Sequence, residues 1–243
     1  MSSAPDFTSR LLRRERLIVL VGVALLAVLS WWFVAAGGGM ADGMGAAAPP
    51  FCALVLMWWL MMMAMMLPSA IPAILLYARV RQAWNNGPAI AQSWIFLCGY
   101  VAVWLLFSIG AALAQRLSMG GLMALDNRYA KAALLIAAGA YQLSPLKSAC
   151  VSVCRSPAQF ISRHWRPGWD GAIRLGLMHG IYCVGCCWLL MALLFVVGVM
   201  NLLWVVALTA VVTIEKLVRN GALLGRAAGI GLLAWGALKL AGH

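Results

Sequence analysis

Charged side chains are scarce in this sequence. Only 10% of its 243 residues are charged, and six of these are acidic. A soluble domain has about a quarter of its residues charged, so this chain has too few charges to cover a water-facing surface. Apolar residues make up 65% of the chain, and its mean hydropathy is +0.94. The composition therefore predicts an integral membrane protein surrounded by the lipid bilayer.

Common catalytic motifs are missing as well. The sequence has no G-x-x-x-x-G-K-[ST] phosphate loop, no G-x-S-x-G and no H-E-x-x-H. Transport driven by ATP hydrolysis on this chain is therefore excluded. With three histidines in the sequence, a haem held by two axial histidines is not expected either. Nothing at this level decides whether the protein is an enzyme.

The basic residues carry the topology signal. The formal net charge of +12 does not indicate nucleic-acid binding, because the Lys and Arg residues stand in short tracts between apolar runs. With a cytoplasmic N-terminus, fourteen of the 18 basic residues face inward, and four (Arg116, Arg128, Lys131 and Lys239) face outward. The positive-inside rule therefore predicts the N-terminus in the cytoplasm and the C-terminus outside.

Apolar runs of about 20 residues cross the hydrocarbon core as helices. Seven runs qualify as candidate spans: Leu17–Ala36, Phe51–Ala78, Trp94–Ala114, Ala132–Leu146, Ala172–Val199, Leu202–Leu217 and Ala227–Leu240. We expect an all-α, polytopic transmembrane bundle of about seven spans in the inner (cytoplasmic) membrane of a bacterial cell. Residues 1–16 form a basic cytoplasmic segment, and residues 17–243 form one transmembrane domain.

Proline and glycine make some spans irregular. Pro68 and Pro72 should kink the second span, and Pro145 should interrupt the short fourth one. Gly221, Gly225 and Gly229 recur at four-residue spacing. Such small residues permit close helix contact within the chain or between protomers of a homo-oligomer.

Cysteines form the sharpest chemical feature. Two lie in KSACVSVCRSP, and three more follow a histidine in HGIYCVGCC. Residues three or four apart share a helix face, so each segment could present its donors together. The candidate ligands are Cys150, Cys154, His179, Cys183, Cys186 and Cys187. If the two segments converge, they supply the three or four donors that a soft metal needs. The alternative is inert packing, which we assign to the isolated Cys52 and Cys98.

A methionine-rich run supplies further soft donors. The segment WWLMMMAMMLP contains Met61, Met62, Met65 and Met66 just ahead of Pro68. Thioethers favour Cu(I), although methionine in an apolar span more commonly fills the core. Glu215 is the acidic residue nearest a predicted membrane-buried position, and we expect it to pair locally with Lys216 or Arg219 rather than to bind metal or protons.

Three segments carry a family resemblance: WWLMMMAMMLPSAIPAILLYAR, YQLSPLKSACVSVCRSP and MHGIYCVGCCWLLMALLFVVGVMNLLWVVALTAVVTIEKL. Across Trp58 to Leu217 the chain resembles an uncharacterised family of predicted metal-binding integral membrane proteins, a domain of unknown function. The resemblance implies a ligand role for the six Cys and His positions, with the methionine run in support. It supplies neither a substrate nor a metal.

Charge favours Cu(I) over zinc. Four thiolates would leave a zinc site with two negative charges, whereas two thiolates leave a Cu(I) site with one, and isolated charge is costly in a low-dielectric medium. The sequence thus favours a membrane protein that transports, stores or delivers Cu(I), with a metal donor or acceptor as partner. A membrane subunit of a metal-dependent oxidoreductase, with partner subunits, and a metal-free helical scaffold remain the alternatives.

Overall fold

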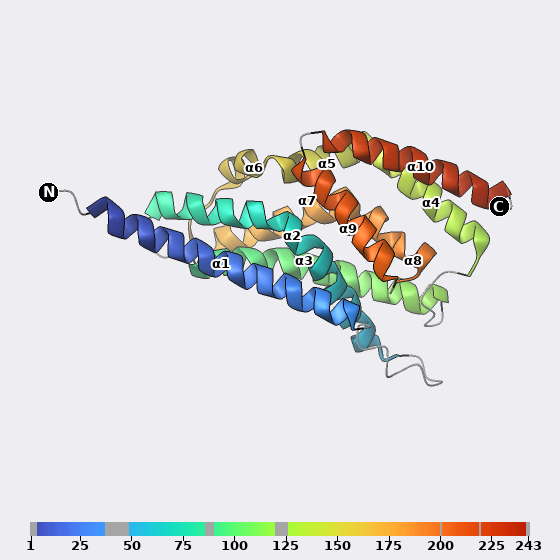
Figure 1. Cartoon of the computed structure of the whole chain (residues 1–243), viewed down its shortest axis with the longest axis horizontal. Coiled ribbons are helices and arrows are strands. Elements are labelled where there is room, and N and C mark those ends of the chain that lie inside the picture. The colour runs from blue at the N-terminus through green and yellow to red at the C-terminus, as the bar shows by residue number, and fades with distance from the viewer. Residues whose placement is uncertain are drawn as a thin grey trace.

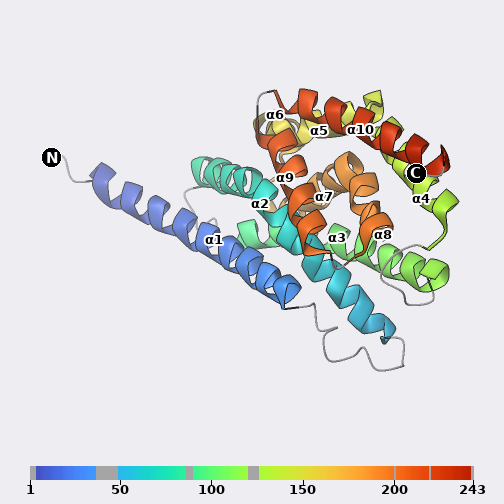
Figure 2. The same ribbon diagram turned by 45° about the vertical axis from the view of Figure 1, so that its right-hand side comes forward.

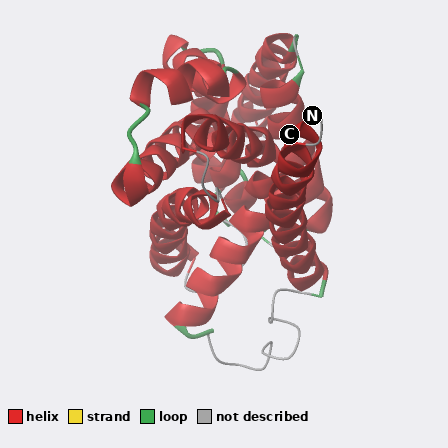
Figure 3. Ribbon diagram, turned by 90° about the vertical axis from the view of Figure 1, so that its left-hand side faces the viewer, coloured by secondary structure: helices red, strands yellow, loops and turns green. Residues whose placement is uncertain are grey.

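The computed structural model describes residues 4–36, 49–85, 90–119, 126–199, 201–218 and 220–241, and these ranges contain helices but no strand. In chain order the helices are α1 (Ala4–Ala35), α2 (Phe51–Asn85), α3 (Ile90–Met119), α4 (Arg128–Gln142), α5 (Pro145–Arg155), α6 (Pro157–His164), α7 (Gly168–Ala192), α8 (Leu194–Val197), α9 (Leu202–Leu217) and α10 (Gly221–Ala241). Figure 3 shows this helical architecture end on. The predicted all-α class is confirmed.

The helices are arranged around α2 and α7. α2 packs between α1 and α3, α7 packs along α3, and α9 crosses α2 (Figure 1). α4 and α10 form a second packed pair, and α10 also contacts α9. The short helices α5 and α6 join this pair to α7, and α5 lies against α7. Segments far apart in the sequence therefore meet around α7.

The expectation of seven spans is only partly met. Within the described ranges, five helical segments are long and apolar enough to cross a membrane: Leu17–Ala35, Phe51–Gln82, Ile90–Leu117, Gly168–Val197 and Gly221–Ala241. α4 has 15 residues and α9 has 16, short of the roughly 20 needed for a crossing. The outer surface is apolar, with Trp32, Leu106 and Leu203 each about three-quarters exposed (75%, 69% and 76%). Such a surface suits contact with lipid.

The prolines act as the sequence predicts. α2 continues through Pro68 and Pro72, and Figure 2 shows that the helix changes direction along its length. Each proline removes one backbone donor and crowds the preceding turn, which accounts for the bend. At Pro145 the chain instead starts a new helix, because Ser144 caps α5 by accepting from the Lys147 N–H at 3.2 Å. This break turns α5 toward α7.

Glycines let the central helices approach closely. A β-carbon on Gly99 of α3 would lie 2.5 Å from the Ile173 carbonyl oxygen of α7, closer than any side chain tolerates. In α4, a β-carbon on Gly139 would lie 2.8 Å from the Gly229 carbonyl oxygen of α10. The glycine spacing noted in the sequence therefore serves contact within the chain.

Candidate metal centre

α7 carries the predicted donors into the core. Cys183, Cys186 and Cys187 are each 1–2% exposed, and His179 is 3% exposed. The Cys186 and Cys187 thiols both donate to the Cys183 carbonyl, at 3.0 and 3.1 Å. The four-residue spacing that predicted a shared face therefore holds for Cys183 and Cys187.

α5 adds a thiol from the other predicted segment. The Cys154 thiol lies close enough to the Cys183 and Cys186 thiols for them to raise its pKa. Gly185 lets α5 come this close, since a β-carbon there would lie 3.0 Å from the sulfur of the neighbouring Cys150. The two cysteine segments thus converge, and we call Cys154, Cys183, Cys186 and Cys187 the thiol cluster.

Both α5 thiols have a raised pKa. Hydrogen bonding to Cys183 and Cys186 raises the pKa of the Cys154 thiol well above its usual value. Burial, with a smaller contribution from Cys186, raises the pKa of Cys150. A metal binds the thiolate, so its uptake at Cys154 would release a proton.

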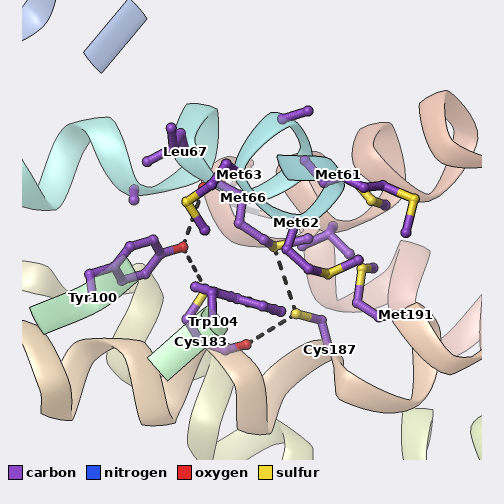
Figure 4. Close-up of a cluster of buried hydrophobic side chains, with 14 of the residues drawn as sticks. Met61, Met62, Met63, Met66, Leu67, Tyr100, Trp104, Cys183, Cys187 and Met191 are labelled. Atoms are coloured by element: carbon purple, nitrogen blue, oxygen red, sulfur yellow. Dashed lines mark hydrogen bonds between the residues drawn. The ribbon is translucent and has the colours of Figure 1, made fainter. Parts of the chain in front are cut away.

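The methionines of α2 cover the thiol cluster. All four predicted methionine ligands are fully buried, but Met66 alone among them has a described contact with a cysteine: its sulfur lies 3.9 Å from Cys187 Sγ. Figure 4 shows Met66 reaching toward Cys187, whereas Met61 points away from it. Met62, Met65 and Met61 fill the surrounding core and remain predicted ligands only.

A lysine that the sequence analysis did not place here reaches the same point. Lys216 Nζ lies 3.0 Å from Cys183 Sγ, 3.4 Å from Ser69 Oγ and 4.0 Å from Met66 Sδ. The lysine is 5% exposed, and a buried ammonium requires a negative partner. The adjacent Cys183 sulfur can supply one as a thiolate.

The expected local pairing of Glu215 with Lys216 is wrong. Glu215 instead forms an ion pair with Lys147 of α5 at 2.6 Å, while Arg219 lies outside the described residues. Neighbouring residues on a helix point about 100° apart, so Glu215 and Lys216 face different helices. Glu215 faces α5, and Lys216 faces the thiol cluster.

Aromatic side chains complete the surroundings. The Tyr100 hydroxyl lies 3.2 Å from Cys183 Sγ, and Figure 4 shows it beside the cluster. His179 lies one turn from Cys183 but packs between aromatic rings, with the Tyr100 ring centroid 5.7 Å away. Its Nδ1 is buried without a hydrogen-bond partner. His179 therefore keeps one buried ring nitrogen without a hydrogen-bond partner, one helical turn from Cys183.

Some predicted positions stay outside this centre. Cys150 is partly buried beside Gly185, and the isolated Cys52 and Cys98 are exposed on the outer surface rather than packed in the core as expected. Across the described part of the chain, no three His, Cys, Asp or Glu side chains are arranged to hold a metal ion. The Cys186 and Cys187 thiols are directed at a backbone carbonyl, so a multidentate arrangement requires their side chains to rotate.

Thiols, a thioether and an ammonium in a dry helical core are the chemistry of a protein that handles soft metal ions. Residues 55–239 match a family described as PpoB2, copper chaperone, and the chain belongs to that family. The matched region includes every predicted ligand and omits the whole of α1. No curated protein and no solved structure matches the chain. The expectation of a copper-handling protein is therefore confirmed at the level of the family.

Proposed function

We propose that this protein is an integral membrane copper chaperone that holds Cu(I) as cargo between the thiol cluster and Met66. One observation carries the proposal: α5 packs its cysteine pair against the thiols of α7, where Cys187 Sγ lies 3.9 Å from the Met66 thioether. Thiolate and thioether sulfurs are the donors that Cu(I) prefers. The arrangement brings both kinds together at the buried side chains of Cys183, Cys187 and Met66.

Charge supports Cu(I) ahead of zinc. Two thiolates around Cu(I) leave one negative charge, and Lys216, 3.0 Å from Cys183 Sγ, balances it. Zinc prefers four charged or strongly donating ligands, and a four-thiolate zinc site would retain a net negative charge even beside Lys216. Uncompensated charge is expensive in the apolar interior, so the lysine favours the singly charged ion.

The membrane setting and the partners form part of the same proposal. The five long apolar helices support a multi-pass membrane protein. The inner membrane and a cytoplasmic N-terminus are proposed from the basic residues that precede the first span. A copper chaperone needs a donor and an acceptor, and we infer that other copper-handling proteins fill these roles. Reporter fusions at the two ends test the topology: activity of a periplasmic reporter on the N-terminus contradicts it.

The central experiment removes two thiols of the cluster. The full chain is purified in uncharged detergent without chelator, loaded with Cu(I), dialysed against a Cu(I) buffer and analysed for metal. We expect about one copper per chain in the wild type and none in Cys183→Ser/Cys187→Ser, whereas Cys52→Ser/Cys98→Ser retains it. Equal copper in both double variants would refute the site. One equivalent of zinc with no copper uptake would reverse the choice of metal.

A second comparison tests the convergence of the two segments. Cys150 and Cys154 both belong to α5. Cys154 lies near the thiols of Cys183 and Cys186, whereas Cys150 lies beside Gly185 of α7. We expect Cys154→Ser to weaken Cu(I) binding by at least about tenfold, because a metal–thiolate bond is lost. Cys150→Ser should change it less than about threefold. A loss of Cu(I) affinity in Cys150→Ser larger than that in Cys154→Ser would contradict the assignment of Cys154 as the α5 ligand.

A further inference from the structure

A cavity of about 530 Å³ lies between α4, α5, α9 and α10, and no residue of the thiol cluster lines it. Small-molecule sites occupy roughly 300–1,000 Å³, so the cavity is large enough for a ligand. Three basic side chains line it (Lys147, Arg155 and Arg226), against one acidic side chain, Glu215. The copper proposal uses none of these residues.

The floor of the cavity is a fixed charge pair. Lys147 and Glu215 are 2% and 8% exposed and pair at 2.6 Å. Gly225 brings the α10 backbone against them, since a β-carbon there would lie 3.1 Å from the Glu215 carboxyl carbon. Besides this pair, the charged side chains of the lining are Arg155 and Arg226, and both are basic.

A buried amide points to a missing acceptor. Gln142 lines the cavity and is 5% exposed. The Lys147 ammonium can only donate hydrogen bonds, so it is the side-chain oxygen of Gln142 that accepts from Lys147. The NH2 group of Gln142 therefore points away from Lys147. That nitrogen is buried with no hydrogen-bond partner, which is costly unless a ligand or water accepts from it.

From this cluster we propose that the cavity binds a phosphate ester. Phosphate offers several acceptor oxygens, matches the planar fork of an arginine and complements a lining with three basic side chains and one acidic one. Arg155 donates to the Val218 carbonyl at 3.0 Å, a bond that leaves its positive charge in place. The apolar side chains of Leu143 and Val151 in the lining suit the carbon part of the ester. The same chemistry comes from an anionic phospholipid headgroup or from a soluble phosphate ester.

The test measures binding of two probes by the full chain in uncharged detergent. Native mass spectrometry counts bound phosphatidylglycerol, and equilibrium dialysis measures radiolabelled glycerol 3-phosphate. We expect saturable binding at one site per chain, weakened at least about tenfold in Arg155→Gln/Arg226→Gln, because charge-assisted hydrogen bonds are lost. The control Arg163→Gln/Arg174→Gln removes the same charge from exposed positions outside the cavity and should bind like the wild type.

Each outcome decides something. Binding of phosphatidylglycerol alone identifies a lipid headgroup as the source, and binding of glycerol 3-phosphate as well identifies a soluble ester; both support the proposal. Absence of saturable binding of either probe, equal weakening in the control, or stronger binding of succinate overturns it. Copper content, measured on the same samples, should stay at the wild-type value in both double variants, so the outcome is separate from the copper function.

Discussion

Replacing Lys216 by methionine removes the ammonium beside the thiol cluster while preserving most of the side-chain volume. Lys216 Nζ lies 3.0 Å from Cys183 Sγ, and at an effective dielectric constant of about 20 a full charge pair at this distance attracts by about 5–6 kcal/mol. In a copper complex the negative charge is shared between two sulfurs, so about half of this attraction remains. We therefore expect Lys216→Met to weaken Cu(I) binding by about 2–3 kcal/mol, or roughly 30- to 150-fold.

The assay is competition for Cu(I) between the purified full chain and bicinchoninate, followed by the absorbance of the bicinchoninate complex. Lys239→Met, near the far end of α10, is the control and should keep the wild-type affinity. Thermal unfolding should show Lys216→Met as stable as the wild type, because the variant no longer buries a charge. An affinity within threefold of the wild type would refute the role of Lys216 as the counter-charge.

Two further predictions concern stability, both measured by unfolding in sodium dodecyl sulfate with tryptophan fluorescence. Glu215→Gln leaves Lys147 buried without its ion pair and should cost about 3 kcal/mol or more; a loss no larger than that of the exposed Asp170→Asn would contradict this. Gly99→Ala forces α3 and α7 apart and should cost about 1–3 kcal/mol. Gly110→Ala, on the same helix with open space at the β-carbon, should be neutral or stabilising by up to about 1 kcal/mol; similar losses in both would dismiss the close-contact argument.

The helices could be predicted from the sequence because long apolar runs leave the backbone no other way to satisfy its hydrogen bonds in lipid. The helix break at Pro145 could also be predicted, since proline has no backbone N–H to continue the hydrogen bonds of a helix. The number of membrane spans could not be predicted in the same way. α4 and α9 are apolar enough to be counted but too short to qualify, and hydropathy does not reveal what packs around a short helix.

The candidate site could be predicted from the sequence only where its geometry depends on residues close together in the chain. The spacing of Cys183 and Cys187 fixes their common face on any helix, and the structure keeps it. The position of Lys216 depends on how α9 packs against α2 and α7, so spacing along the chain could not place it. One local signal did exist: adjacent helical residues diverge by about 100°, which argues against the expected pairing of Glu215 with Lys216.

The depth of the thiol cluster has a kinetic consequence. Cys183, Cys187 and Met66 are each 2% exposed or less, so a docked acceptor meets none of these sulfurs at the surface. Departure of the ion from these sulfurs, either past α5 and its partly exposed Cys154 or by separation of α2 and α7, is a unimolecular event with its own rate. Adding more acceptor would therefore raise the rate of copper delivery only until it equals the rate of this departure step. Substitutions that loosen the α2–α7 contact would increase that limiting rate.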